Sequence, residues 1–325
     1  MSDLRFHALL LGSGRSGTTL LAKLVDASED VLYRHEPDIS RPTREPPFLP
    51  NASEFGQHVA AARDYLGRLA TTRDERTVGS PPYFRKSFRS PFGELLWRAN
   101  AYGAKALDRA KLKAPVFDWT SRPPVLIGKS VSSVARAPLF RAADPELKIV
   151  HIARHPCAVL ASRITGQDLG ALDRHDYADE AARIEAAEAY RENPDYVAAY
   201  GYPERVAYMW MVHNDGVHRA LEGDPNYFFV QYEDLCLNLE ARAREIYAFL
   251  GLEWGAQVQA FIRSMSEADA ASTEFFSVVR NSRSGLYKWR EKLSAEDIAA
   301  VAGVVSQSGL GAKVLAFADS GRQAD

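Results

Sequence analysis

The sequence predicts an α/β fold in which a mostly parallel central sheet carries helices on both faces. Short apolar runs recur along the chain, and they are continuous rather than alternating, which is typical of strands buried on both sides. Helical patterns follow most of these runs, as in parallel βαβ units. The length of 325 residues and the hydrophobic fraction of 46% allow a large core.

The composition indicates the setting in which the protein works. The net charge of −2 gives no general attraction to nucleic acid or acidic membranes, and nothing resembles a nucleic-acid module. Two cysteines, Cys157 and Cys236, are too few for a disulfide framework and indicate a reducing compartment. No apolar stretch approaches the roughly twenty residues of a membrane span. The first strand begins too early to leave room for a signal peptide, so we expect a cytoplasmic protein.

The first strand is expected at Ala8–Leu11, within the sequence FHALLLGSGRSGTTLL. A glycine turn follows at Gly12–Gly17 and contains Arg15, and Thr18-Thr19 opens a helix. A strand, a glycine turn and a helix N-terminus together form an anion site, because free backbone N–H groups and the positive helix end face one point. Arg15 adds a full positive charge there.

Spacing alone leaves two interpretations of this turn. Gly12, Gly14 and Gly17 fit G-x-G-x-x-G with Glu36 about twenty residues on, which resembles a dinucleotide-binding fingerprint. The same glycines fit the start of a Walker A loop, but Thr18 stands where its lysine should be. An ATP-splitting loop needs that lysine to reach the outer phosphates, so an ordinary kinase or ATPase is disfavoured.

The second strand is expected at residues 31–33 and ends in His35-Glu36-Pro37. Proline stops the strand, which leaves Glu36 at its carboxyl edge beside the glycine turn. Open α/β sheets bind their ligands at this edge, although a solvated loop carboxylate would have the same local sequence.

The region from Ser40 to Pro124 is rich in proline and contains two expected helices, around residues 55–69 and 92–110. Between Arg63 and Lys113 there are twelve Lys/Arg against five Asp/Glu, with aromatic residues interleaved. Such a stretch either grips an acidic or amphiphilic acceptor or forms a solvated basic face over core aromatics.

Two more buried strands are expected at residues 125–127 and 147–153. The first leads into a turn that contains Lys129. The second delivers Arg154-His155-Pro156 and then a helix, since proline suits the first helical turn. Arg154 and Ser162 converge if the helix folds back beside the strand end.

The later chain predicts an acidic helix over residues 177–191, an amphipathic helix over 204–221 and a fifth strand over 226–232. Asn238 is expected to cap the next helix, and Gly251 to close it. The segment from Arg280 to Arg290 carries four positive residues and no acid, so it is a second candidate anion loop. A helix capped by Ser294-x-x-Asp297 follows.

In several places, and in the family's order, the chain resembles the sulfotransferases that use 3′-phosphoadenosine 5′-phosphosulfate (PAPS). Arg15-Ser16-Gly17-Thr18-Thr19 looks like their loop for the donor's 5′-phosphosulfate. Arg154 and Ser162, in RHPCAVLAS, match the pair that holds the 3′-phosphate. Tyr232-Glu233-Asp234-Leu235 and Leu286-Tyr287-Lys288-Trp289-Arg290 look like a late strand–helix unit and the closing loop. A dinucleotide enzyme gives no reason for the later motifs.

The resemblance implies roles for particular residues. Donor binding would fall to Gly14, Arg15, Ser16, Gly17, Thr18, Thr19, Arg154, Ser162, Tyr232, Arg283 and Lys288. Glu36-Pro37 is similar to the turn of tyrosylprotein and carbohydrate sulfotransferases that carries the general base. Lys129 matches a lysine of the tyrosylprotein enzymes, and Arg15 would share its work on the leaving group. One departure is Tyr287, which replaces the serine before Lys-Trp in those enzymes and puts the role of this position in doubt.

The resemblance also implies the rest of the expectation. Residues 1–325 would form one P-loop-containing sulfotransferase-like domain, with acceptor-specificity insertions at 40–124 and 165–205. It would move a sulfuryl group from PAPS to a carbohydrate, phenolic or tyrosyl, or lipid or polyketide hydroxyl, without a metal. The oligomeric state is left open. A nucleotide kinase-like phosphotransferase and a non-catalytic nucleotide-binding protein remain as alternatives.

Overall fold

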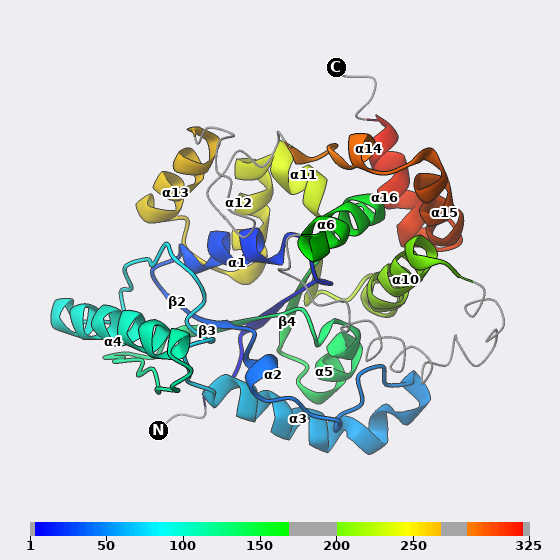
Figure 1. Ribbon diagram of the computed structural model, residues 1–325. Helices are drawn as coiled ribbons and strands as arrows, with labels where there is room; N and C mark the ends of the chain where they lie inside the picture. Colours follow the sequence, from blue (N-terminus) through cyan, green and yellow to red (C-terminus); the bar gives the residue numbers. More distant parts are fainter. Residues whose placement is uncertain (1–3, 169–199, 268–284, 321–325) are drawn as a thin grey trace.

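The computed structural model describes residues 4–168, 200–267 and 285–320 (Figure 1). Five strands form one sheet in the order β2-β3-β1-β4-β5, and every neighbouring pair is parallel. The strands are β1 (Ala8–Leu11), β2 (Val31–His35), β3 (Val125–Ser130), β4 (Lys148–Ala153) and β5 (Tyr227–Gln231). The predicted α/β class and all five predicted strands are confirmed. The predicted helix over residues 177–191 lies outside the described residues.

Successive residues of β1 point to opposite faces of the sheet, and each face is covered by helices. Leu10 packs on the side of α1 (Thr18–Asp26), α12 (Leu239–Leu250) and α13 (Ala256–Glu267). Leu9 and Leu11 pack on the side of α3 (Phe55–Thr71) and α5 (Ala137–Ala143). Figure 1 shows these two layers above and below the sheet. Because both faces are covered, the strands are continuous apolar runs.

A third apolar cluster lies beside the β4–β5 end of the sheet. Its members come mainly from α6 (Pro156–Asp168), α10 (Tyr202–Leu221), α15 (Ala295–Val305) and α16 (Gly309–Ser320), together with Trp289. The predicted capping box confirms the start of α15, since the Ser294 hydroxyl accepts from the Asp297 N–H at 3.0 Å. Pro156 begins α6, as predicted.

Two predictions about element ends are wrong. Lys129 was expected in a turn, but β3 continues through Ser130, because Lys129 is in register with Leu10 on one side and His35 on the other. Asn238 precedes α12 without a side-chain cap; its amide instead donates to Asp234 at 2.7 Å. Gly251 closes α12 in the left-handed conformation with φ 69°, as predicted.

The region from residue 40 to 124 adds peripheral helices to this frame. α2 (Pro37–Ser40) and α3 lie at the carboxyl end of β2 and beneath the sheet. α4 (Pro91–Arg109) lies at the β2 edge, on the outside of the molecule (Figure 1). Among the described residues, no helix is long and apolar enough to cross a membrane.

Candidate active site

The turn after β1 has a shape that two of its glycines make possible. A Cβ on Gly12 would lie 2.4 Å from the Ile152 carbonyl oxygen, so the chain leaves β1 in direct contact with β4. Gly17 has φ +89°, and a Cβ there would lie 2.0 Å from Cδ2 of Tyr232. Both positions therefore exclude a side chain. Arg15 is also left-handed, with φ 72°.

Some side chains of the turn form hydrogen bonds within the turn itself, which leaves its backbone amides accessible to a ligand. Ser16 is fully buried, and its hydroxyl bonds to the Ser13 hydroxyl at 2.7 Å and to the Ser13 carbonyl. Thr18 is buried and Thr19 is half-buried, whereas no atom lies within 4 Å of the Cβ direction of Gly14. Gly17 gives α1 no side-chain cap. The amides of the first helical turn are thus left for an anion.

Arg15 connects this turn to the middle of α6. Its Nε donates to the Ser162 hydroxyl at 2.9 Å, across 147 residues of sequence. The Arg154 guanidinium lies 4.7 Å from the centroid of the Tyr232 ring, and the same ring contacts Gly17. The structure therefore brings together Arg15, Gly17, Arg154, Ser162 and Tyr232 at the carboxyl ends of β1, β4 and β5.

The backbone around Arg154 is fixed by three groups that we did not identify from the sequence. Trp210 Nε1 donates to the Arg154 carbonyl at 2.8 Å, and Glu233 accepts from the His155 N–H at 3.0 Å. Trp289 stacks on the His155 ring with centroids 4.4 Å apart and planes 12° apart. Glu233 belongs to the YEDL motif and Trp289 to the KW motif, but neither motif predicts that these side chains contact His155.

The electrostatics of this corner favour an anion. Burial, with the nearby Arg290 and Arg154, lowers the pKa of His155 to about 3, so the ring is neutral at pH 7. Burial also raises the pKa of Glu233, although its bond to the His155 amide and the charge of Arg154 act against the shift. The buried Nε of Arg154 has no hydrogen-bond partner in the described structure. Such a buried donor is costly unless a ligand accepts from it.

Glu36 and Lys129 form an ion pair at the carboxyl end of β2 and β3. Lys129 Nζ donates to Glu36 Oε1, and the Glu36 N–H donates to the Lys129 carbonyl at 2.8 Å. The Lys129 side chain is 3% exposed and that of Glu36 is 14% exposed. Glu36 has φ 44°, a left-handed conformation that a non-glycine residue seldom adopts, and it precedes the Pro37 that begins α2. The turn therefore holds the carboxylate against the strand end.

The pair keeps Glu36 ionised. Burial alone would raise its pKa, but the positive charge and hydrogen bond of Lys129 outweigh burial, and the pKa of Glu36 lies below its ordinary value. Burial and the charge of Lys129 lower the pKa of His35 to about 3, so this neighbour is neutral at pH 7. Arg76 contributes from 4.0 Å and is 47% exposed. Lys129 is the main cation acting on Glu36.

The closing segment differs from the expectation in its side chains. Lys288 is exposed and stands at the N-terminus of α14 (Trp289–Lys292), while Trp289 is the buried residue that reaches the site. The Tyr287 ring faces the Arg290 guanidinium at 4.7 Å. Arg283 lies outside the described residues. That Lys288 binds the donor stays a prediction.

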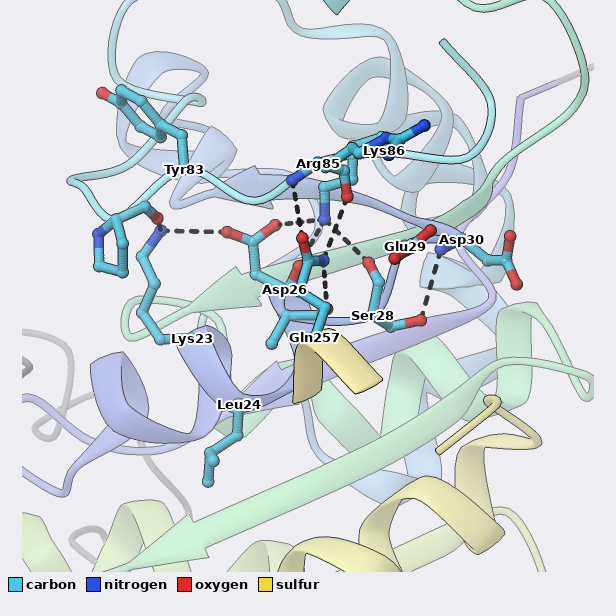
Figure 2. Close-up of polar contacts among 12 residues, drawn as sticks. Lys23, Leu24, Asp26, Ser28, Glu29, Asp30, Tyr83, Arg85, Lys86 and Gln257 are labelled. Atoms are coloured by element: carbon cyan, nitrogen blue, oxygen red, sulfur yellow. Dashed lines mark hydrogen bonds and ion pairs between the residues drawn. The ribbon is translucent and has the colours of Figure 1, made fainter. Parts of the chain in front are cut away.

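Part of the basic stretch found in the sequence is internal rather than exposed. Asp26 lies between Lys23 and Lys86, at 3.0 Å and 2.9 Å, and Figure 2 shows this arrangement beneath Tyr83. Burial opposes ionisation of Asp26, but the two lysines outweigh it and lower its pKa. Gln257 fastens the same segment to α13 by accepting from the Arg85 N–H at 3.0 Å. These cations stabilise the fold.

Within the described ranges, no three His, Cys, Asp or Glu side chains are grouped so as to hold a metal ion. The charge available to an anionic ligand at the sheet edge comes from Arg15, Lys129 and Arg154 and from the start of α1.

Comparison with known proteins identifies the class to which this fold and site belong. A family model described as "Sulfotransferase family" matches residues 8–256. The chain therefore belongs to the sulfotransferase family, and the sulfotransferase resemblance of its motifs is confirmed. Its five-stranded parallel sheet with helices on both faces is the corresponding α/β fold.

Individual relatives agree with this class. The chain is 24% identical over 331 residues to carbohydrate sulfotransferase 1 of Mus musculus, covering 90% of this chain and 75% of that protein. A shorter stretch of 74 residues is 35% identical to carbohydrate sulfotransferase 1 of Homo sapiens, covering 22% of this chain and 18% of that protein. Among solved structures, the chain is similar to the sulfotransferase domain from the curacin biosynthetic pathway, with 15% identity, a TM-score of 0.46 and coverage of 94% and 98%. Mouse sulfotransferase SULT7A1 complexed with PAP is similar at 14% identity and a TM-score of 0.41, with coverage of 95% and 88%.

Proposed function

We propose that this protein transfers a sulfuryl group from PAPS to a carbohydrate hydroxyl, with Glu36 as general base. One observation carries the proposal. Two cationic subsites lie on one sheet edge with an ionised carboxylate: an uncapped helix start beside Arg15, and a half-buried Arg154 whose Nε is buried without a hydrogen-bond partner. A bisphosphorylated donor and a hydroxyl acceptor need these three features together.

The residues present fit the donor. The amides of Ser16–Thr19 and the Arg15 guanidinium would hold the 5′-phosphosulfate, as a helix N-terminus and an arginine bind phosphate. Arg154 and Ser162 would hold the 3′-phosphate, and the Arg154 Nε would gain the acceptor that it lacks. The Tyr232 ring supports both subsites, because it contacts Gly17 and Arg154.

The chemistry follows from charge and position. The acceptor oxygen forms a bond to sulfur as the bond from sulfur to the 5′-phosphate oxygen breaks, and the acceptor proton goes to Glu36. Arg15 and Lys129 stabilise the negative charge that spreads over the leaving and sulfuryl oxygens, by analogy with phosphoryl transfer. A hydroxyl becomes strongly acidic once its oxygen bonds to sulfur, so a carboxylate with a lowered pKa is a sufficient base late in the step.

The acceptor class in this proposal comes from relatives. Two matched proteins are carbohydrate sulfotransferases, so carbohydrate hydroxyls are the first acceptors to test, before phenolic and lipid hydroxyls. The cytoplasmic location expected from the sequence remains part of the proposal. Cys157 and Cys236 are both buried.

Two measurements test the proposal. The first is calorimetric titration with 3′,5′-adenosine bisphosphate, with ATP plus Mg²⁺ and with NAD⁺; a preference for ATP or NAD⁺ would contradict the donor assignment. The second uses sulfur-labelled PAPS with a panel of sugars, phenols and long-chain alcohols. Glu36→Gln should bind the bisphosphate as the wild type does and lose about 100-fold or more in turnover. Full turnover by Glu36→Gln would remove it as the base.

A further inference from the structure

The outer face of α4 carries an exposed apolar stripe, in which Tyr102 also meets the Tyr83 ring edge-on with centroids 5.4 Å apart. Phe92, Leu95 and Tyr102 are 69%, 64% and 54% exposed. Ala99 and Ala106 are also exposed and complete a spacing of three and four residues, which places all five on one helix face. Large exposed side chains usually occur singly, so a row of them marks a contact surface.

Further exposed apolar side chains lie in the last turn of α4 and beyond its end. Leu107, Leu112 and Phe117 are 41%, 58% and 51% exposed. Within the described ranges, six of the seven exposed large hydrophobic residues lie between residues 92 and 117, and the seventh is Ile39 at 38%. We call residues 92–117 the α4 surface.

The inner face of α4 is accounted for by packing. Ala101 and Ala104 are buried against Val78 and Val116, with Trp97 beside them. Glu94 is held by Arg98 at 2.9 Å and by Arg89 at 3.3 Å. The helix is thus firmly attached, and its outer stripe is not a poorly packed core face.

Positive charges beside the stripe favour a negatively charged partner. Arg109, Lys111 and Lys113 are exposed, and the described structure gives none of them an ion-pair partner. Asp108 is the exposed acid among them. A second copy that docked through the same surface would place the same basic flank against this one. An anionic lipid surface offers both an apolar phase and negative headgroups.

We propose that the α4 surface binds the protein to anionic membranes, with Phe92, Leu95 and Tyr102 entering the interface. The net charge of −2 gives no general attraction of this kind, so the attraction is local to the three cations. α4 also lies near the turn that holds Glu36, because its Ala101 and Ala104 pack against Val78, and a Cβ on the adjacent Gly79 would lie 3.4 Å from the His35 Cβ. The proposal stands independently of sulfuryl transfer, because binding needs neither donor nor acceptor.

Co-sedimentation with vesicles tests the proposal on the full chain. The wild type should bind vesicles of phosphatidylcholine with phosphatidylglycerol, bind phosphatidylcholine alone at least about tenfold more weakly, and lose binding as salt is added. Phe92→Ser/Leu95→Ser and, separately, Arg109→Glu/Lys113→Glu should each weaken binding at least about tenfold. These side chains are exposed, so thermal unfolding should change little.

The matched control is Arg219→Glu/Arg263→Glu, which makes the same charge change at exposed positions of α10 and α13. It should bind the anionic vesicles nearly as well as the wild type. Equal binding to both kinds of vesicle, or equal losses in control and α4 variants, would overturn the proposal. So would a dimer in light scattering that Phe92→Ser/Leu95→Ser converts to a monomer, since a second copy would then cover the stripe.

Discussion

Separating Glu36 from Lys129 should cost more stability than a surface ion pair would. The two side chains are 14% and 3% exposed, and Glu36→Gln leaves a buried ammonium without a counter-charge. Breaking a buried pair in this way costs about 3 kcal/mol or more of the free energy of unfolding. Lys129→Met should cost somewhat less, because Arg76 remains 4.0 Å from Glu36. The double variant, which removes both charges, should unfold within about 1 kcal/mol of the wild type.

The dependence on pH gives this prediction a second signature. The pKa of Glu36 is lower in the folded protein than its ordinary value of 4.5. The contribution of the pair is therefore fully present above about pH 4.5 and is lost as the pH falls through the folded-state pKa. The difference in unfolding free energy between the wild type and Glu36→Gln should stay constant at higher pH and shrink below 4.5.

The assay is urea unfolding, followed by circular dichroism, of the wild type, both single variants and the double variant across this pH range. Glu245→Gln is the control, because its pair with Arg242 at 2.6 Å is 41% and 47% exposed and should contribute less than about 0.5 kcal/mol. The reasoning is refuted if Glu36→Gln costs no more than this control. It is also refuted if the double variant loses the sum of the two single losses.

Three more predictions follow from the site and the core. Gly17→Ala should lower the melting temperature strongly, because the φ of +89° and the Tyr232 ring 2.0 Å from a Cβ at this position both exclude a side chain. Gly14→Ala should change the melting temperature little, and equal shifts for the two variants would contradict the contact with Tyr232. In calorimetry, Arg154→Ala should weaken the binding of 3′,5′-adenosine bisphosphate far more than the binding of adenosine 5′-phosphosulfate. Equal losses of affinity would mean that the 3′ subsite is misplaced. Burial lowers the pKa of His151 to about 4, so its neutral form contributes stability that is present above pH 6.5 and lost as the pH falls towards 4. The wild-type advantage over His151→Gln in urea unfolding should shrink by about 1.4 kcal/mol per pH unit in that range, and a constant advantage would argue against a depressed pKa.

The strands and the anion turn could be predicted because local sequence determines them. A strand covered on both faces must be apolar throughout, and a turn with φ +89° at Gly17 needs glycine. The same reasoning places Arg15 and Glu36 at the carboxyl edge of a parallel sheet, and the resemblance to sulfotransferases added Lys129 and Arg154.

Contacts between distant segments could not be predicted in this way. Arg15 reaches Ser162 across 147 residues, and Asp26 finds Lys86 across 60. Which cation of a basic stretch turns inward depends on the packing of other elements, and local charge counts carry no information about it. The wrong prediction for Lys129 has the same cause. Its local sequence indicated a turn, but pairing with β1 and β2 extends β3 through this residue.

The sheet order has a consequence for how variants of this protein can be judged. Each strand supplies the site at its carboxyl end: the turn after β1, Glu36 after β2, Lys129 in β3, Arg154 after β4 and Tyr232 after β5. In the proposed donor site the 5′ subsite follows β1 and the 3′ subsite follows β4, so binding at both phosphates would require the span between them. Normal affinity of a variant for 3′,5′-adenosine bisphosphate would therefore also indicate that the variant is correctly folded. Under this proposal, a variant that binds it normally has assembled β1, β4 and β5 in register, and its loss of turnover can be assigned to chemistry rather than to misfolding.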